Sequence, residues 1–192
     1  MPRFTRAELE SYRDAEVPDL LPGPGDPRLR LLFVGINPGL WTAAVQTHFA
    51  RPGNRFYPAL LAAGIIDRPV DAGAGMTDDD RDYFRARGLG ITNVVRRATA
   101  RADELTAEEL REGGRQLVER IERTTPTVVA ILGVTAYRAA FSVPRATVGR
   151  QAEPLAGAEL WVVPNPSGLN AHDTVQSLAS AYGEAARAAG VL

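Results

Sequence analysis

Four short apolar runs, separated by segments with helical patterns, constrain the fold of this chain more than any other feature. They occupy residues 30–36, 90–95, 127–132 and 159–163, and the interior of each run carries no charge. Runs of this length are typical of strands buried on both faces of a sheet. Strands that alternate with helices form parallel sheets covered by helices. We therefore predict an α/β three-layer sandwich with a mostly parallel sheet of four to five strands.

The predicted helices are marked by their starting residues as well as by their patterns. Thr5 with Glu8, and Thr106 with Glu109, fit the capping box that opens many helices. Together with the apolar spacing, these signals predict helices over residues 6–15, 56–63, 106–123, 135–141 and 174–189. The segments over residues 17–27, 37–55 and 67–82 contain Pro, Gly or Asp at turn positions and are predicted to be loops.

The composition excludes several kinds of chemistry. The 192 residues include no cysteine, which rules out disulfides, thiolate catalysis and cysteine-based zinc or iron–sulfur sites. All 22 basic residues are arginine, so no lysine can form a Schiff base. The length and the 45% hydrophobic content suit a single domain, which we expect to span residues 1–192 and to begin with a helix and loop over residues 1–28.

Charge and hydropathy indicate a soluble protein. No apolar run approaches the length that a bilayer requires, and the first residues lead into charge, unlike a secretory signal. We therefore expect a cytoplasmic location and no membrane partner. The formal net charge of −1 gives no overall attraction to nucleic acid, so any contact with DNA would depend on local basic patches.

Two Asn-Pro loops are the clearest signal of a functional site. Asn37-Pro38 follows the first predicted strand, and Asn165-Pro166 follows the fourth. Taken singly, each is an ordinary turn. However, ligands bind at the carboxyl ends of the strands in open α/β sheets, so two such loops in equivalent positions predict one shared site.

Aromatic and basic residues near these loops offer further ligand contacts. Phe49 is either a loop aromatic folded onto the core or a stacking platform for a planar ligand such as a nucleobase. Arg51 and Arg55 are either solvated charges or phosphate contacts, and the same alternatives apply to the arginine cluster of residues 96–101.

The sequence favours neither a metal nor a nucleotide cofactor. The acidic run at residues 78–80 lacks the spacing of a calcium loop and suits the solvated start of a helix. Two histidines, His48 and His172, are too few for a convincing metal site. No glycine-rich phosphate loop or dinucleotide fingerprint follows a strand. We expect no cofactor and no metal.

Five motifs together resemble those of the mismatch-specific uracil/thymine DNA glycosylases, a branch of the uracil-DNA glycosylase superfamily. They occur in the order and spacing of that family and cover residues 35–39, 48–56, 90–95, 111–115 and 165–169. The resemblance extends over about residues 29–185. It implies the fold of that superfamily, and a monomeric bacterial enzyme that works on double-stranded DNA at the nucleoid.

The resemblance also implies the activity and its residues. A monofunctional glycosylase would remove uracil from mismatches with guanine, with thymine or related bases as further candidate substrates. Asn37 would hold the attacking water, and Phe49 would stack on the flipped base. Further roles follow by position: base recognition by Ile36, Gly39 and Asn165; a wedge and its backbone contacts at Ser167, Gly168, Leu169 and Asn170; and phosphate contacts by Arg51, Arg55 and Arg96.

The chain departs from the family pattern at two places. Bacterial members often carry Arg two residues after the wedge Leu, whereas here Asn170-Ala171-His172 follows, which leaves the reading of the opposite guanine open. Asn93 stands where some bacterial relatives have Lys, and this difference would modify rate or base preference. Two alternative functions stay open: a lesion-sensing DNA-binding module with little turnover, and a hydrolase of free nucleosides or nucleotides.

Overall fold

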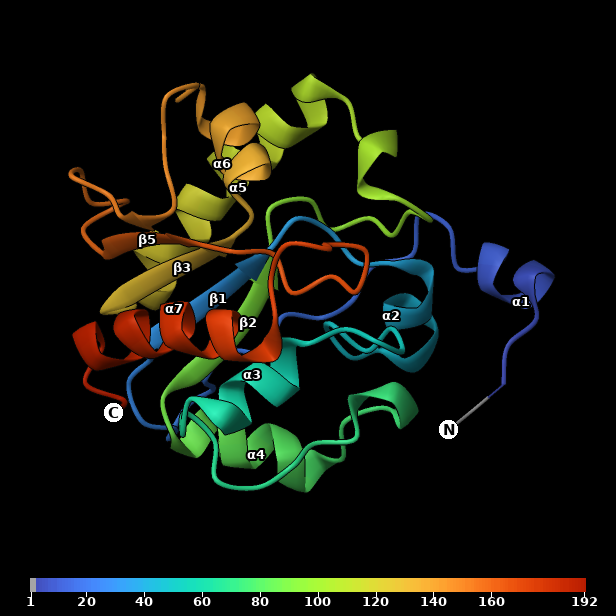
Figure 1. Ribbon diagram of the computed structural model, residues 1–192, viewed down its shortest axis with the longest axis horizontal. Helices are drawn as coiled ribbons and strands as arrows, with labels where there is room; N and C mark the ends of the chain where they lie inside the picture. Colours follow the sequence, from blue (N-terminus) through green and yellow to red (C-terminus); the bar gives the residue numbers. More distant parts are fainter. Residues whose placement is uncertain (1–2) are drawn as a thin grey trace.

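Five strands form one sheet at the centre of the molecule, in the order β2-β1-β3-β5-β4 (Figure 1). This computed structural model describes residues 3–192. Four strands are parallel, namely β1 (Leu31–Gly35), β2 (Leu89–Asn93), β3 (Val128–Leu132) and β5 (Glu159–Val163). The short edge strand β4 (Gly149–Arg150) is antiparallel to β5. The predicted α/β sandwich with a mostly parallel sheet is confirmed.

Helices cover both faces of this sheet (Figure 1). On one face lie α3 (Phe56–Ala62), α4 (Asp78–Ala86) and α7 (Val175–Ala188), and on the other lie α5 (Ala107–Thr124) and α6 (Val134–Phe141). The remaining helices are α1 (Arg6–Glu10) and α2 (Leu40–Val45), with 3-10 turns at Ala72–Ala74 and Ala102–Glu104. Within residues 3–192, no helix is both long and apolar enough to span a bilayer.

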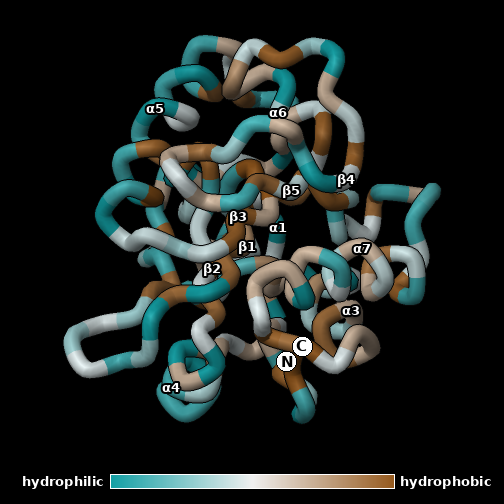
Figure 2. The backbone as a smooth tube through the Cα atoms, turned by 90° about the vertical axis from the view of Figure 1, so that its left-hand side faces the viewer, coloured by the Kyte–Doolittle hydropathy of each residue, from teal (hydrophilic) through white to brown (hydrophobic). Residues whose placement is uncertain are grey.

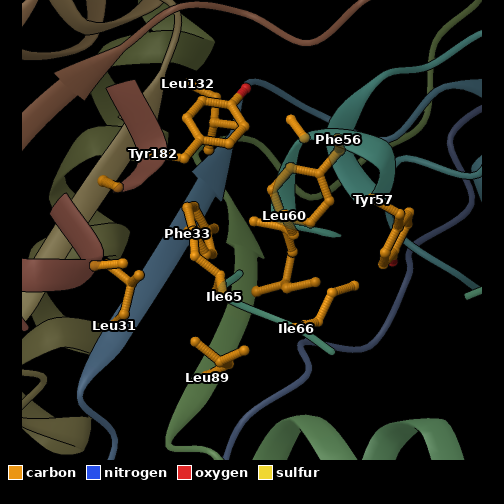
Figure 3. Close-up of a cluster of buried hydrophobic side chains, with 14 of the residues drawn as sticks. Leu31, Phe33, Phe56, Tyr57, Leu60, Ile65, Ile66, Leu89, Leu132 and Tyr182 are labelled. Atoms are coloured by element: carbon orange, nitrogen blue, oxygen red, sulfur yellow. The ribbon is translucent and has the colours of Figure 1, made fainter. Parts of the chain in front are cut away.

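The pleat of the strands divides the core into two layers. Along β1, Leu31 and Phe33 pack against the layer of α3 and α7, whereas Leu32 and Val34 pack against α5 and α6. Successive side chains of a strand point to opposite faces, so both sets must be apolar when helices cover both. Figure 3 shows the first layer, where the rings of Phe33, Tyr182 and Phe56 pack against one another. In Figure 2 the central strands are accordingly mostly brown, the colour of hydrophobic residues.

Several predicted boundaries were wrong where elements are short. The first helix ends at Glu10 instead of residue 15, and Asp14 takes a left-handed φ of 63° while its N–H donates to the Ala98 carbonyl. The predicted loop of residues 37–55 contains α2, and α4 begins at Asp78, inside the predicted connection of residues 67–82. The capping boxes at Thr5 and Thr106 are present as predicted.

Candidate active site

A pocket of about 360 Å³ opens at the carboxyl ends of the parallel strands. Both Asn-Pro loops line it, together with the loop before α3 and the connection between β2 and α5. It brings together nine of the residues singled out from the sequence: Ile36, Asn37, Gly39, Phe49, Arg51, Asn93, Asn165, Ser167 and Leu169. Their inferred roles in catalysis and binding stay predictions.

Asn37, at the end of the first strand, is fixed through its amide nitrogen. Nδ2 lies 2.8 Å from Thr99 Oγ1 and 3.1 Å from the carbonyl oxygens of both Arg97 and Pro38. Thr99 is buried, and its own hydroxyl donates to the Arg101 carbonyl at 2.8 Å, so its oxygen is left to accept from Asn37. With both amide hydrogens used, Asn37 presents its Oδ1 as an acceptor.

Asn165, at the end of the fourth parallel strand, is fixed through its amide oxygen instead. Its Oδ1 accepts from the Ser167 N–H at 2.9 Å, which forms the side-chain turn that Asn favours in loops. No acceptor for its Nδ2 lies within hydrogen-bonding distance in residues 3–192. Asn165 therefore presents a donor at the edge of the pocket.

The floor of the pocket requires glycine at residue 35. A Cβ on Gly35 would collide with Asn93 Oδ1 and would come within 3.1 Å of the Phe49 ring. Asn93 is buried and Phe49 is half-buried, so neither can move freely. Any side chain at residue 35 would therefore displace the two groups that line the bottom of the pocket.

His48 orients Asn93 from behind the floor. The His48 side chain is buried, and burial lowers the pKa of its imidazole, so the ring is neutral. His48 Nε2 lies 3.0 Å from the Pro18 carbonyl, to which it donates, and Nδ1 lies 3.1 Å from Asn93 Nδ2 and accepts from it. This arrangement turns Asn93 Oδ1 toward Gly35. Within residues 3–192, no cluster of three or more His, Asp or Glu could hold a metal.

Phe49 is folded onto the core and also lines the pocket, and its role as a stacking platform stays a prediction. Its ring packs on Phe56 with the centroids 4.2 Å apart, while it also lines the pocket. Its backbone takes a left-handed φ of 56°, which is uncommon for a bulky residue and concentrates at functional sites. Tyr57 supports this backbone, because its hydroxyl donates to the His48 carbonyl at 2.9 Å.

The loop of residues 166–173, called the wedge loop below, projects Leu169 into solvent. Leu169 is 75% exposed, and Gly168 lies so close to the Gly53 carbonyl that a Cβ would approach its oxygen to 2.7 Å. Asn170 Nδ2 closes the loop on itself by donating to the Asn165 carbonyl at 3.1 Å. His172 is exposed in the same loop and does not line the pocket.

Arg55 supports this loop and does not face outward as a phosphate contact would. Its NH2 group donates to the carbonyls of Ser167 and Asn170 at 2.6 Å each, and its NH1 group donates to the Asp173 carbonyl. The backbone N–H of Arg55 also donates to the Pro166 carbonyl at 3.0 Å. The guanidinium of Arg55 is thus committed to loop carbonyls in this structure, and its phosphate contact stays a prediction.

The other arginines near the pocket differ in their partners. Arg96 lies outside the pocket and faces Glu16 at 3.4 Å, and its phosphate contact stays a prediction. Arg97 pairs with Asp14 and Glu109, and Arg101 pairs with Asp103. Arg51 is exposed and has no ion pair within residues 3–192. Sequence reasoning overlooked Thr99 and the contact between His48 and Asn93, since nothing local marks either one.

A comparison with known families agrees with this geometry. Residues 22–186 match the family model described as the uracil DNA glycosylase superfamily. The match covers both Asn-Pro loops, all four parallel strands and the residues that hydrogen-bond to the side chains of Asn37, Asn93 and Asn165. Pro18, whose carbonyl accepts from His48, lies just before it. Because the match spans far more than half of the chain, the protein belongs to the uracil DNA glycosylase superfamily, whose members hydrolyse N-glycosidic bonds of uracil in DNA.

Proposed function

We propose that this protein is a monofunctional mismatch-specific uracil-DNA glycosylase that starts base excision repair in the cytoplasm as a monomer. Its substrate would be uracil, and to some extent thymine, paired with guanine in double-stranded DNA. The observation that carries the proposal is the pair of asparagines on one pocket, since Asn37 presents an acceptor and Asn165 a donor. Hydrolysis needs an acceptor for water and a donor for the leaving base.

The chemistry of Asn37 defines the order of bond breaking. An amide does not titrate at neutral pH, so Asn37 Oδ1 can orient a water molecule but cannot act as a general base that removes its proton. The glycosidic bond must therefore break ahead of water attack, giving an oxocarbenium-like sugar and an anionic base. Asn165 Nδ2 would stabilise that anion as the negative charge develops. Because the chain has no lysine, water completes the reaction and no lyase step on a side-chain amine follows.

Access to the pocket requires the nucleotide to leave the duplex. Flipping costs a few kcal/mol, and less at a mismatch, which favours G·U and G·T over paired U·A. Leu169 would enter the stack and offset part of this cost. Leu169→Ala should therefore slow excision from a duplex and spare single-stranded uracil. Equal losses on both substrates would contradict the wedge role.

The proposal is tested by single-turnover incubation with labelled DNA carrying U·G, T·G, U·A or single-stranded U, followed by alkali. Strand breaks at U·G that appear only after alkali are expected, because a monofunctional enzyme leaves an intact abasic strand. Breaks before alkali would contradict the monofunctional mechanism. Tight binding of U·G without excision would establish the lesion-sensing alternative instead.

A further inference from the structure

A second and larger cavity adjoins the active-site pocket. It measures about 980 Å³ and lies between α1 on one side and α2 with the connection at residues 100–104 on the other. We call it the α1 groove. It shares Gly39, Arg51, Ala100 and Arg101 with the active-site pocket, so the two cavities meet along one rim.

The outer wall of the α1 groove lies outside the residues that match the family model. Helix α1 precedes residues 22–186 and buries none of its own residues, and in Figure 1 it stands apart from the body beside α2. Specific contacts nevertheless fix it. Phe4 packs its ring edgewise on Trp41 with the centroids 5.0 Å apart, and Arg13 pairs with Glu104. Leu9 of α1 also packs, partly buried, against a small apolar cluster that includes Leu40 and Ala43, so the helix is held in place at the edge of the active site with its polar side chains exposed.

The charge of the α1 groove is locally positive. Four arginines line it against two glutamates, although the whole chain carries a net charge of −1. Arg6 from α1 and Arg51 from the opposite rim are exposed and have no ion pair within residues 3–192. The base of the groove is apolar and includes Leu40, Trp41 and Pro52. Unpaired guanidiniums on both sides of a groove are complementary to a polyanion.

The position of the groove identifies the polyanion. Residues 51–53 lie between the two features, since Gly53 packs against Gly168 of the wedge loop while Arg51 lines the groove. A nucleotide held in the active-site pocket has a strand continuing on each side of it. With one side at the wedge loop, the shared rim at Gly39 and Arg51 leaves the α1 groove as the path for the other side.

We propose that the α1 groove binds the sugar–phosphate backbone of the DNA strand that carries the flipped nucleotide, with Arg6 as a phosphate contact contributed by the N-terminal helix. This inference rests on the proposed function, because it takes the pocket to hold a flipped nucleotide. The helix would lengthen the stretch of DNA that the enzyme contacts on one side of the lesion.

The test measures the salt dependence of binding to a U·G duplex. Each phosphate neutralised by a basic side chain contributes about −0.9 to the slope of log K against log salt concentration. We expect Arg6→Ala to make this slope shallower by roughly 0.9, and Arg6→Lys to restore it. Asn37→Ala in every variant keeps the substrate intact during titration. Arg145→Ala is the matched control, since Arg145 is exposed, lacks an ion pair within residues 3–192 and lies far along the chain, between α6 and β4.

A second arm locates the contact along the DNA. The duplex is shortened on one side of the uracil at a time. Removing the side that faces α1 should weaken binding by the enzyme with native Arg6, and it should weaken binding by the Arg6→Ala variant much less. Unchanged salt slopes for Arg6→Ala, or equal slopes for Arg6→Ala and Arg145→Ala, would overturn the groove proposal. Excision of uracil is measured separately with the enzyme that keeps Asn37. If the α1 groove does not bind DNA, the salt slopes stay unchanged while excision proceeds; if the protein is not a glycosylase, excision itself is absent.

Discussion

The two Asn-Pro loops share a dipeptide and a position in the sheet, yet they present opposite groups to the same pocket. Asn37 is held by its nitrogen, through acceptors on Thr99 and Arg97 of another segment. Asn165 is held by its oxygen, through the N–H of Ser167 in its own loop. The dipeptide therefore sets the backbone at a strand end, and the neighbouring groups decide which side of the amide faces the ligand.

The loops also differ in how firmly they are supported. The first continues directly into α2, and the Thr99 N–H donates to the Pro38 carbonyl at 3.1 Å. The second projects Leu169 into solvent and is held by Arg55, whose guanidinium donates hydrogen bonds to three carbonyls of the loop. The first loop suits the fixed placement of a water, whereas the second suits a segment that enters DNA.

The largest effect should follow removal of the acceptor in the first loop. Asn37→Ala deletes the only group inferred to orient water, so single-turnover excision of U·G should fall by roughly 10²–10⁴, the range for a positioned catalytic group. Binding of the U·G duplex, measured by fluorescence anisotropy, should change little. Excision at a near-normal rate would remove Asn37 from the mechanism and with it the contrast between the loops.

A slightly smaller effect should follow removal of the donor in the second loop. Asn165→Asp keeps an oxygen for the Ser167 N–H but replaces the pocket-facing donor with an acceptor, so excision should fall by about 10²–10³. Asn165→Ala separates the two functions of the side chain, because it removes the turn as well. If Asn165→Asp excised normally and only Asn165→Ala failed, the side chain would serve the turn alone.

The hydroxyl of Thr99 gives a sharper test of how Asn37 is oriented. Thr99→Val removes the nearest of the three acceptors around Asn37 Nδ2 while keeping the shape of the side chain, and a lost hydrogen bond of about 1 kcal/mol corresponds to a several-fold slower reaction. Thr99→Ser keeps the hydroxyl and should excise at close to the normal rate. Single-turnover rates for both variants make the comparison. Equal losses of excision rate in Thr99→Val and Thr99→Ser would contradict the role of the hydroxyl.

Most of the fold could be predicted because its signals are local. Continuous apolar runs marked the four parallel strands, and Thr5 and Thr106 marked two helix starts through their capping boxes. The nine-residue α4 was missed beyond its acidic start at residues 78–80, which was predicted to open a helix. Two further missed elements are shorter, since α2 has six residues and β4 has two. An element of that size contains too few residues for a period to show.

The site was predictable in its location and less so in its contacts. A strand followed by Asn-Pro is visible in the chain, and the topology then places both loops together. The direction of Arg55 is not visible, since the carbonyls that it binds include Ser167, 112 residues away. The same holds for Asn93 and His48, which are separated by 45 residues. Each of these polar side chains reads locally as an ordinary loop or strand residue.

The smallest predicted effect concerns stability on the buried side of the pocket. Burial lowers the pKa of His48 in the folded protein, although the Pro18 carbonyl and Asp19 oppose the shift. Between that lowered pKa and the unfolded value near 6.5, the unfolded chain binds a proton that the folded chain does not. The free energy of unfolding should therefore decrease as pH falls below about 6.5, by up to about 1.4 kcal/mol per pH unit from this residue.

Urea unfolding of His48→Gln between pH 7.5 and pH 5 isolates this contribution. The variant has no imidazole at residue 48, so its stability should change less steeply with pH than that of the native sequence, whatever its stability at pH 7.5. His172→Gln serves as the control because it removes the exposed histidine of the wedge loop and should keep the native pH dependence. If His172→Gln instead flattened the curve, the pH dependence would arise in the wedge loop and not at the buried His48 that contacts Asn93.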